Sequence, residues 1–169
     1  MRQNQDYFDE IYRKYAKRIY YYIFKMCGDA HQAEDVLQTT FLKAIERADA
    51  FRGESDVVTW LCRIAKNVYL DELRRSENKN VSLERKLEEA GDVLAADSAD
   101  VLTQIIDAQD KKMLYLKIHE LNEIQREVVL QRLLGLSFQE IGEIFGKKET
   151  WARVTFYRAK EQLVKTMGG

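Results

Sequence analysis

Basic and aromatic side chains concentrate at two places in the chain, in patterns that suit nucleic-acid binding. Between positions 147 and 165 there are six basic residues and two acidic ones, although the whole chain has 27 Lys and Arg against 28 Asp and Glu. A local surplus of positive charge can neutralise phosphates. This segment is therefore a candidate DNA-binding helix. A basic helix that is simply exposed to solvent is the plainer alternative.

The second place follows a loop predicted at residues 49–56. At 100° per residue, one face of the next helix collects polar and basic residues and no acidic one. The residues on this face are Thr59, Arg63, Lys66, Asn67, Leu70 and Arg74. Basic groups beside a loop that contains Phe51 and Ser55 can hold unstacked bases of a single strand. Trp60, at the start of this helix, taken alone fits a core or boundary position better.

An acidic face is predicted on the preceding helix, whose apolar stripe runs from Ala33 to Ile45. The residues that cluster away from its apolar stripe are His31, Glu34, Asp35, Gln38 and Leu42. A carboxylate pair beside an exposed leucine suits a protein partner better than DNA, and a solvated face is the alternative. Glu34 and Asp35 point about 100° apart on a helix, so they do not form a general acid and base pair.

Residues that commonly bind metals or act as nucleophiles are scattered. The two cysteines, Cys27 and Cys62, form no CxxC motif, and the histidines are His31 and His119. We expect both thiols to be reduced and buried. A joint role of Cys27 and His31 is the alternative, against which the intervening Gly28 argues. We expect no catalytic residue, no metal and no cofactor.

The elements that must position these residues are helices. The chain has no proline and only 8 glycines, which favours long helices. Apolar residues recur at helical spacing in three stripes, so we predict three helices within residues 6–75. The stripes are Phe8, Ile11, Tyr12, Tyr15, Ile19, Tyr22, Ile23 and Met26; Ala33, Val36, Leu37, Thr40, Phe41, Ala44 and Ile45; and Val57, Leu61, Ile64, Ala65 and Val68.

Residues 76–110 form the predicted linker, because nine acidic residues stand there against three basic ones and the periodicity fades. Four further helices are predicted at 107–120, 123–134, 137–145 and 150–166. Asn122 and Ser137 are the expected N-caps, and Gly135 and Gly146 the expected stops. The last two helices have the layout of a helix-turn-helix, with Arg153, Tyr157 and Lys160 on the exposed flank. The buried stripe of the last helix is expected to be Ala152, Phe156, Ala159 and Leu163.

No apolar run approaches the roughly 18 residues of a membrane span, and the segment MRQNQDYFDE is polar. We therefore expect a cytoplasmic protein without membrane insertion. No segment alternates with a period of two residues, so the predicted fold class is all-α, with two small helical domains.

Two long stretches resemble one protein family. AEDVLQTTFLKAI and FRGESDVVTWLCRIAKNVYLDELRR resemble region two of the extracytoplasmic-function (ECF) sigma factors of bacterial RNA polymerase. LNEIQREVVLQRLLGLSFQEIGEIFG and TWARVTFYRAKEQL resemble their region four. The resemblance covers residues 6–75 and 113–165 and implies region two at 1–75, a linker at 76–110 and region four at 111–169.

The resemblance implies an alternative sigma factor that directs core RNA polymerase to promoters and is not itself an enzyme. It implies contacts to the clamp coiled coil and flap of the polymerase, to promoter DNA and to an anti-sigma factor. The implied clamp contacts are Glu34, Asp35, Gln38 and Leu42. The implied minus-ten contacts are Phe51, Ser55, Trp60, Arg63, Lys66, Asn67, Asp71, Arg74 and Arg75. The implied minus-thirty-five contacts are Arg153, Val154, Tyr157 and Arg158.

The chain departs from the family pattern at three places. Thr39 and Thr40 follow Gln38 where many members have a glutamate, and Asn122 stands where a proline is common. Around the recognition helix, small residues and serine are replaced; the residues here are Glu149, Thr150, Trp151 and Val154. The promoter sequence therefore does not transfer from the family. A stand-alone helix-turn-helix regulator is the alternative function, and it leaves the acidic face and the basic face of the first three helices unexplained.

Overall fold

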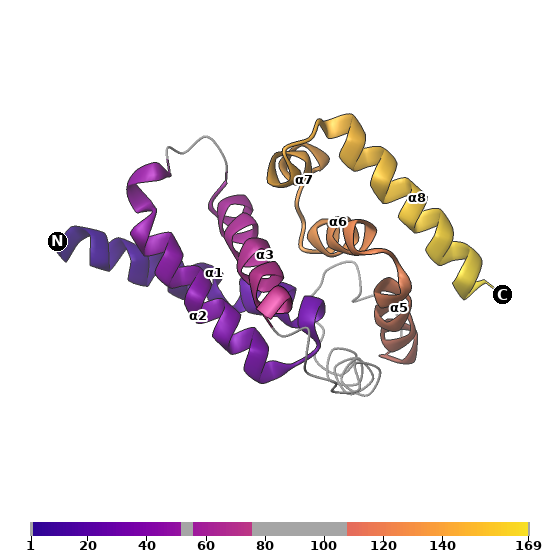
Figure 1. The fold of residues 1–169 in the computed structure, drawn as a ribbon, viewed down its shortest axis with the longest axis horizontal. Helices are drawn as coiled ribbons and strands as arrows, with labels where there is room; N and C mark the ends of the chain where they lie inside the picture. The colour runs from indigo at the N-terminus through magenta and orange to yellow at the C-terminus, as the bar shows by residue number, and fades with distance from the viewer. Residues whose placement is uncertain (1, 52–55, 76–107, 169) are drawn as a thin grey trace. The chain divides into compact units, whose positions relative to one another are not determined.

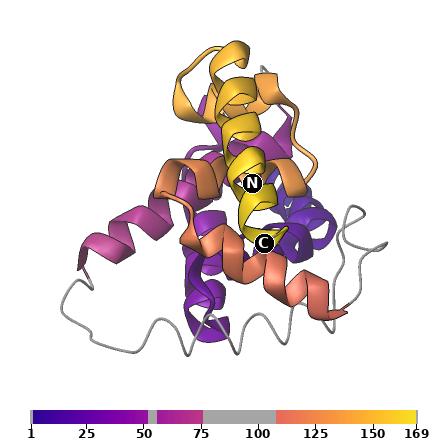
Figure 2. The ribbon, with the colours of Figure 1, turned by 90° about the vertical axis from the view of Figure 1, so that its right-hand side faces the viewer.

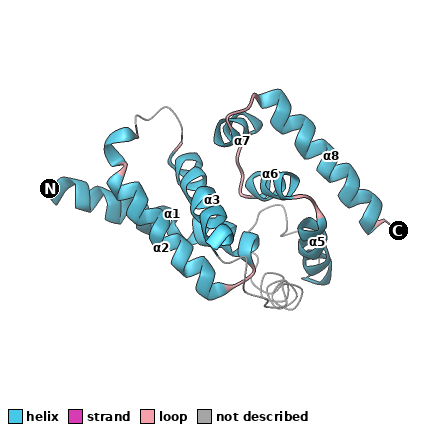
Figure 3. Ribbon diagram, in the orientation of Figure 1, coloured by secondary structure: helices cyan, strands magenta, loops and turns pink. Residues whose placement is uncertain are grey.

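The computed structural model describes residues 2–51, 56–75 and 108–168, and every regular element within them is a helix (Figures 1 and 3). The chain divides into two compact units, Met1–Asn80 and Val81–Gly169. The prediction of an all-α fold is confirmed. The predicted acidic linker lies outside the described residues as far as position 107.

The first unit contains three long helices that pack on one another. They are α1 (Arg2–Cys27), α2 (Ala30–Glu46) and α3 (Val57–Arg75), with a short 3-10 helix, η1 (Ala48–Ala50), after α2. Each long helix contacts the other two (Figure 1). The shared core is mostly apolar, with Thr40 and Thr59 also buried in it; its most deeply buried side chains include Ile19, Tyr22, Ile23, Val36, Val58 and Leu61.

The sharp turn between α1 and α2 places α2 against α1. Gly28 adopts a φ of 70°, which an L side chain rarely adopts. The carboxylate of Asp29 then accepts hydrogen bonds from the backbone N–H groups of His31 (2.9 Å) and Gln32 (3.2 Å), and so caps α2. The Tyr69 hydroxyl donates to the Met26 carbonyl oxygen at 3.2 Å and ties α3 to the end of α1. α1 therefore ends at Cys27, directly before Gly28.

Several positions in this unit differ from the predicted stripes; Phe24, Val58 and Tyr69, for example, are buried although they belong to none of them. Tyr12 and Ile45 are exposed, at 47% and 51%, because they lie at the edges of their apolar stripes; the Tyr12 ring still contacts Phe41 of α2, with 4.9 Å between ring centroids. Thr59, assigned by spacing to the polar face, is buried at 1% exposure. The reason is that α3 packs against both α1 and α2, so its buried face is wider than a single stripe.

The second unit contains α5 (Ala108–Glu120), α6 (Glu123–Leu133), α7 (Phe138–Phe145) and α8 (Glu149–Met167). α8 contacts all three of the other helices. α5 crosses α8 near the C-terminal end of α8 (Figure 2). Ala152, Ala159 and Leu163 of α8 are buried as predicted. Phe156 is only half-buried and packs against Phe138, with 5.5 Å between ring centroids.

The predicted helix signals of this unit are confirmed. The Asn122 side chain accepts from the Gln125 N–H at 2.9 Å and begins α6. The Ser137 hydroxyl accepts from the Glu140 N–H at 3.1 Å, and the Glu140 carboxylate accepts from the Ser137 N–H at 3.0 Å, which forms a capping box. Gly146 ends α7 with a φ of 66°.

Candidate functional site

The exposed face of α2 carries the acidic residues singled out from the sequence. Glu34, Asp35 and Gln38 are exposed, and Leu42 is 61% exposed between them and the end of the helix. The apolar residues Ala33, Val36 and Leu37 point into the core, so the register of the buried stripe alone forces these four side chains outward. We call this set the α2 surface.

Glu72 of α3 extends the α2 surface. Partial burial raises the pKa of Glu72, and the nearby Asp35 carboxylate raises it further, whereas a hydrogen bond from the Gln32 side chain and the charge of Arg75 lower it. Asp35 and Glu72 are therefore close in space although 37 positions separate them in the sequence. Sequence spacing within a single helix gave no signal for this pair.

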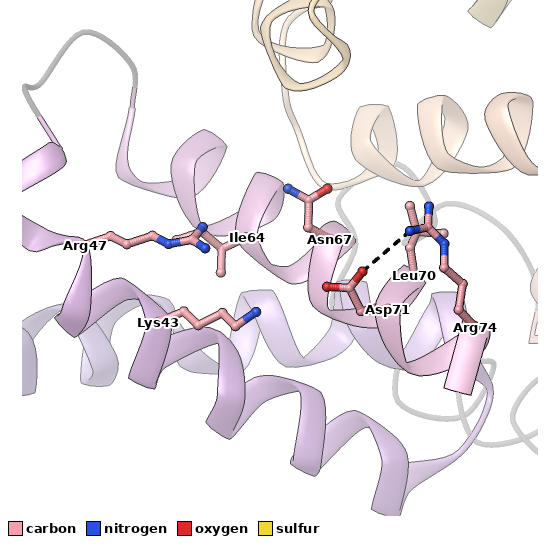
Figure 4. Close-up of a pocket in the computed structure, with 7 residues that line it drawn as sticks. All are labelled: Lys43, Arg47, Ile64, Asn67, Leu70, Asp71 and Arg74. Atoms are coloured by element: carbon pink, nitrogen blue, oxygen red, sulfur yellow. Dashed lines mark ion pairs between the residues drawn. The ribbon is translucent and has the colours of Figure 1, made fainter. Parts of the chain in front are cut away.

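A pocket of about 320 Å³ lies between the C-terminal half of α2 and the outer face of α3 (Figure 4). Ile64 and Leu70 supply its apolar part, and the other lining residues are polar or charged. The lining residues are Lys43, Arg47, Ile64, Asn67, Leu70, Asp71 and Arg74. Three of them are cations, one is an amide and one is a carboxylate. We call this feature the α2–α3 pocket.

The α2–α3 pocket corrects the expectation of a face without acidic residues. Asp71 lies one turn from both Asn67 and Arg74 on α3, and its carboxylate oxygen is 3.9 Å from the Arg74 guanidinium nitrogen. Because residues i, i+4 and i+7 share a helix face, Asp71 belongs beside these two. Lys43 and Arg47 are the residues that sequence analysis missed. Only the packing of α2 on α3 places them opposite Asn67.

The other predicted residues of α3 and its loop lie at varied depths. Phe51 stacks on Trp60 with 4.7 Å between ring centroids and an interplanar angle of 29°, and both rings are half-buried. Arg63, Arg74 and Arg75 are exposed and Lys66 is half-buried. Ser55 lies outside the described residues. The structure thus joins the loop to α3 through the Phe51–Trp60 stack.

The exposed flank of α8 forms a third surface. The predicted residues Arg153, Val154, Tyr157 and Arg158 are all exposed, with Val154 at 42% and Tyr157 at 53%. The Arg153 Nη2 atom lies 2.8 Å from the Glu149 Oε1 atom. The helix-turn-helix α7–Gly146–α8 presents the N-terminal half of α8 to solvent, as a recognition helix requires. We call this set the α8 surface.

The cysteines of the described residues are buried, and their metal-ligating side chains are not grouped. No group of three or more His, Cys, Asp or Glu side chains among them could hold a metal ion. Cys27 and Cys62 are free thiols and are buried, as predicted. No helix in the described ranges combines the length and hydrophobicity needed to cross a bilayer.

Comparison with known proteins identifies the family. The model of Sigma-70 region 2 matches residues 11–79, and the model of Sigma-70 region 4 matches residues 111–163. The ECF RNA polymerase sigma factor SigM of Bacillus subtilis is 30% identical over 156 residues, which are 92% of this chain and 91% of that protein. The chain belongs to the ECF RNA polymerase sigma factors. Its helical units are accordingly region two and region four, and it is an alternative sigma factor, a transcription initiation factor.

One further relative and two solved structures are similar to this chain over most of its length. The sigma factor YlaC of Bacillus subtilis is 27% identical over 98% of this chain and 94% of its own length. The sigma factor RpoE from Bartonella quintana, solved with the anti-sigma factor NepR, has a TM-score of 0.70 at 20% identity, over 95% of this chain and 96% of that one. CnrH, solved with the cytosolic domain of CnrY, has a TM-score of 0.68 at 18% identity, over 97% and 89%. These structures support the helical fold.

Proposed function

We propose that this ECF sigma factor binds core RNA polymerase in the cytoplasm and directs it to a class of promoters, with residues 1–75 as region two, 76–110 as a linker and 111–169 as region four. The observation that supports this proposal best is the presence of the α2 surface, the α2–α3 pocket and the α8 surface in one chain. A stand-alone helix-turn-helix regulator needs only the last of these. The functions proposed for this sigma factor are all binding functions, and no chemical step is assigned to the chain.

The decisive experiment is transcription in vitro with purified core polymerase and a pool of promoters. The chain is expected to produce defined start sites that core polymerase alone does not produce. Sequencing of the transcripts then gives the promoter class. If the chain binds promoter DNA without polymerase and start sites do not depend on it, the stand-alone regulator is the correct function.

We assign the α2 surface to the clamp coiled coil of the polymerase. Its two carboxylates next to the exposed Leu42 provide charge and apolar area for a protein partner. Asp35→Lys should weaken binding to core polymerase by about 1 to 3 kcal/mol, because the reversed charge opposes its partner. Glu10→Lys, an equal charge reversal at an exposed position of α1, is the control and should bind as the wild type does. Equal binding by both variants would place the interface elsewhere.

We assign the α2–α3 pocket and the Phe51–Trp60 stack to the separated strand of the minus-ten element. Apolar walls suit the face of a base, an amide and a carboxylate suit its edge, and the three cations suit the flanking phosphates. The loop around residues 49–55 is assigned to the capture of an extruded base. Residues 52–55 of this loop lie outside the described residues.

Lys43→Ala tests the assignment of the pocket. It should weaken binding of the holoenzyme to a promoter already mismatched at the minus-ten element. It should also reduce the slope of the logarithm of the binding constant against the logarithm of the salt concentration by about the amount expected for one phosphate contact. Lys17→Ala removes the same charge from an exposed position of α1 and serves as the control. An unchanged salt slope for Lys43→Ala, relative to Lys17→Ala, would exclude the pocket from DNA binding.

We assign the α8 surface to the minus-thirty-five element, and region four also to the polymerase flap. An anti-sigma factor is a further proposed partner, supported by the similar structure of RpoE, which was solved with one. Coexpression with the products of neighbouring genes should yield a soluble complex that blocks binding to core polymerase. If none of them binds, regulation by expression level replaces this proposal.

A further inference from the structure

The first turn of α8 carries an acidic residue to which the proposed function gives no role. Glu149 and Arg153 are four residues apart, and the Glu149 Oε1 atom accepts a hydrogen bond from Arg153 Nη2 at 2.8 Å. The side chains are 50% and 52% exposed. An exposed ion pair of this kind contributes little to the free energy of unfolding. A carboxylate in the first turn of α8 stabilises the N-terminal end of the helix, but that effect does not require its contact with Arg153.

A second contact holds the same guanidinium from α7. The Arg153 Cζ atom lies 5.5 Å from the ring centroid of Phe138, within the range of a cation–π contact. The Phe138 ring is itself fixed, because Arg132 lies over it at 4.3 Å and Phe156 packs against it at 5.5 Å. Arg132 is held in turn by a hydrogen bond to the Leu136 carbonyl oxygen at 2.9 Å.

These contacts order Arg153 before DNA is present. An arginine recognises guanine with two N–H donors directed at O6 and N7, which demands a fixed guanidinium plane. A long side chain that is already ordered loses less conformational entropy on binding. The guanidinium has five N–H donors, so one bond to Glu149 leaves the others available for a base edge.

We propose that Glu149 is a specificity-determining positioning residue, which orients Arg153 toward one guanine-containing base pair of the upstream promoter element. This inference rests on the proposed role of the α8 surface. The carboxylate also repels phosphates, so a docking position that brings Glu149 against the DNA backbone is disfavoured. Both effects raise selectivity, and neither requires Glu149 to contact a base.

Glu149→Gln tests the proposal in the holoenzyme, because it removes the charge and keeps the size. Full-length chain with core polymerase selects from a promoter pool randomised at the upstream element, and the bound DNA is sequenced. The preference for guanine at one position should fall by about tenfold, with the other positions unchanged. Arg153→Ala should lose the preference at the same position, and the double variant should lose no more than Arg153→Ala alone.

Glu161→Gln is the matched control, since it removes the same charge from an exposed position in the C-terminal half of α8. It should select the same sequences as the wild type. The proposal is overturned if Glu149→Gln keeps every preference, or if its loss falls at a position that Arg153→Ala leaves unchanged. If the wild-type chain selects no upstream sequence at all, the assignment of α8 fails, and this inference fails with it.

Discussion

Gly142 lies where α7 passes closest to the turn that leads into α8. A Cβ atom at this position would be 2.7 Å from the Lys147 carbonyl oxygen and 3.0 Å from that of Lys148. The Lys147 N–H also donates to the Gly142 carbonyl oxygen at 2.8 Å, so the two backbones are held together. The approach of α8 to α7 therefore depends on the missing side chain of one residue.

We predict that Gly142→Ala destabilises the second unit by about 1 to 3 kcal/mol, because relief of the clash shifts the turn. This net loss remains because the steric cost of the added Cβ atom outweighs the gain of roughly 1 kcal/mol that alanine brings over glycine in a helix. Urea unfolding followed by the fluorescence of Trp151 measures it. The wild-type chain is the reference, because a substitution at Gly146, with its φ of 66°, would itself be strained. A Gly142→Ala variant as stable as the wild type would show that the turn adapts.

The two thiols are protected by burial. Cys27 is 4% exposed and Cys62 is fully buried. Burial raises the pKa of the Cys27 thiol to about 11, against a partial offset from the backbone of Asp29. The neutral thiol donates a hydrogen bond to the Asp29 carbonyl oxygen at 3.3 Å. The reactive thiolate is therefore scarce at neutral pH.

We predict that neither thiol reacts with a soluble disulfide reagent at pH 8 within minutes, and that both react at once in denaturant. The raised pKa of Cys27 also means that its contribution to stability is present below the pKa of an unfolded cysteine and is lost as the pH rises toward 11. Counting the released chromophore at pH 8 and pH 11 checks both statements. Rapid reaction of one thiol in the folded chain at pH 8 would show that region two opens locally.

At the scale of elements, α7 is a helix of only eight residues. Isolated helices of this length are marginal in water, so α7 depends on its ends and on its contacts with α8. The capping box of Ser137 and Glu140 satisfies backbone N–H groups at one end, and Gly146 ends the helix at the other. The position of α8 relative to α7 therefore depends on these caps.

We predict that Ser137→Ala lowers the free energy of unfolding of the second unit by about 1 kcal/mol, because the Glu140 N–H loses its acceptor. Ser137→Thr keeps an oxygen at the same place and is the matched control. Urea unfolding of the two variants, followed at Trp151, gives the difference. If the alanine variant equals the threonine variant, water replaces the hydroxyl without cost.

At the scale of the whole molecule, the chain divides into two compact units. Trp60 lies in the first unit and Trp151 in the second, and these are the only tryptophans of the chain. Replacing either one by phenylalanine leaves the other as a reporter for its own unit. The chain itself thus provides a test of independent folding.

We predict that the two reporters unfold independently. Ile23→Val should shift the unfolding of the Trp60 unit by about 1 kcal/mol and leave the Trp151 unit unchanged, and Ile141→Val should do the reverse. Both isoleucines are fully buried, which makes the pair a matched test. A shift of both reporters by either substitution would show that the units share a cooperative core, contrary to the proposed boundaries.

The sequence by itself determined the helices, their ends and the family. Helix periodicity, Asn122, Ser137 and the glycines act over a few residues, so their effects are visible in one dimension. It also predicted the exposure of Glu34, Asp35, Gln38, Arg153 and Tyr157, because a helix with one buried stripe must turn the opposite residues to solvent.

Only the tertiary structure decided which helices share a surface. The packing of α3 against both α1 and α2 buried Thr59, left Tyr12 and Ile45 exposed, and brought Lys43 and Arg47 to the pocket that contains Asn67. The nearness of Asp35 and Glu72, and the contact of Arg153 with Phe138, arise in the same way. The physical reason is that these neighbours depend on the angle and depth at which two helices pack, which the spacing within either helix does not encode.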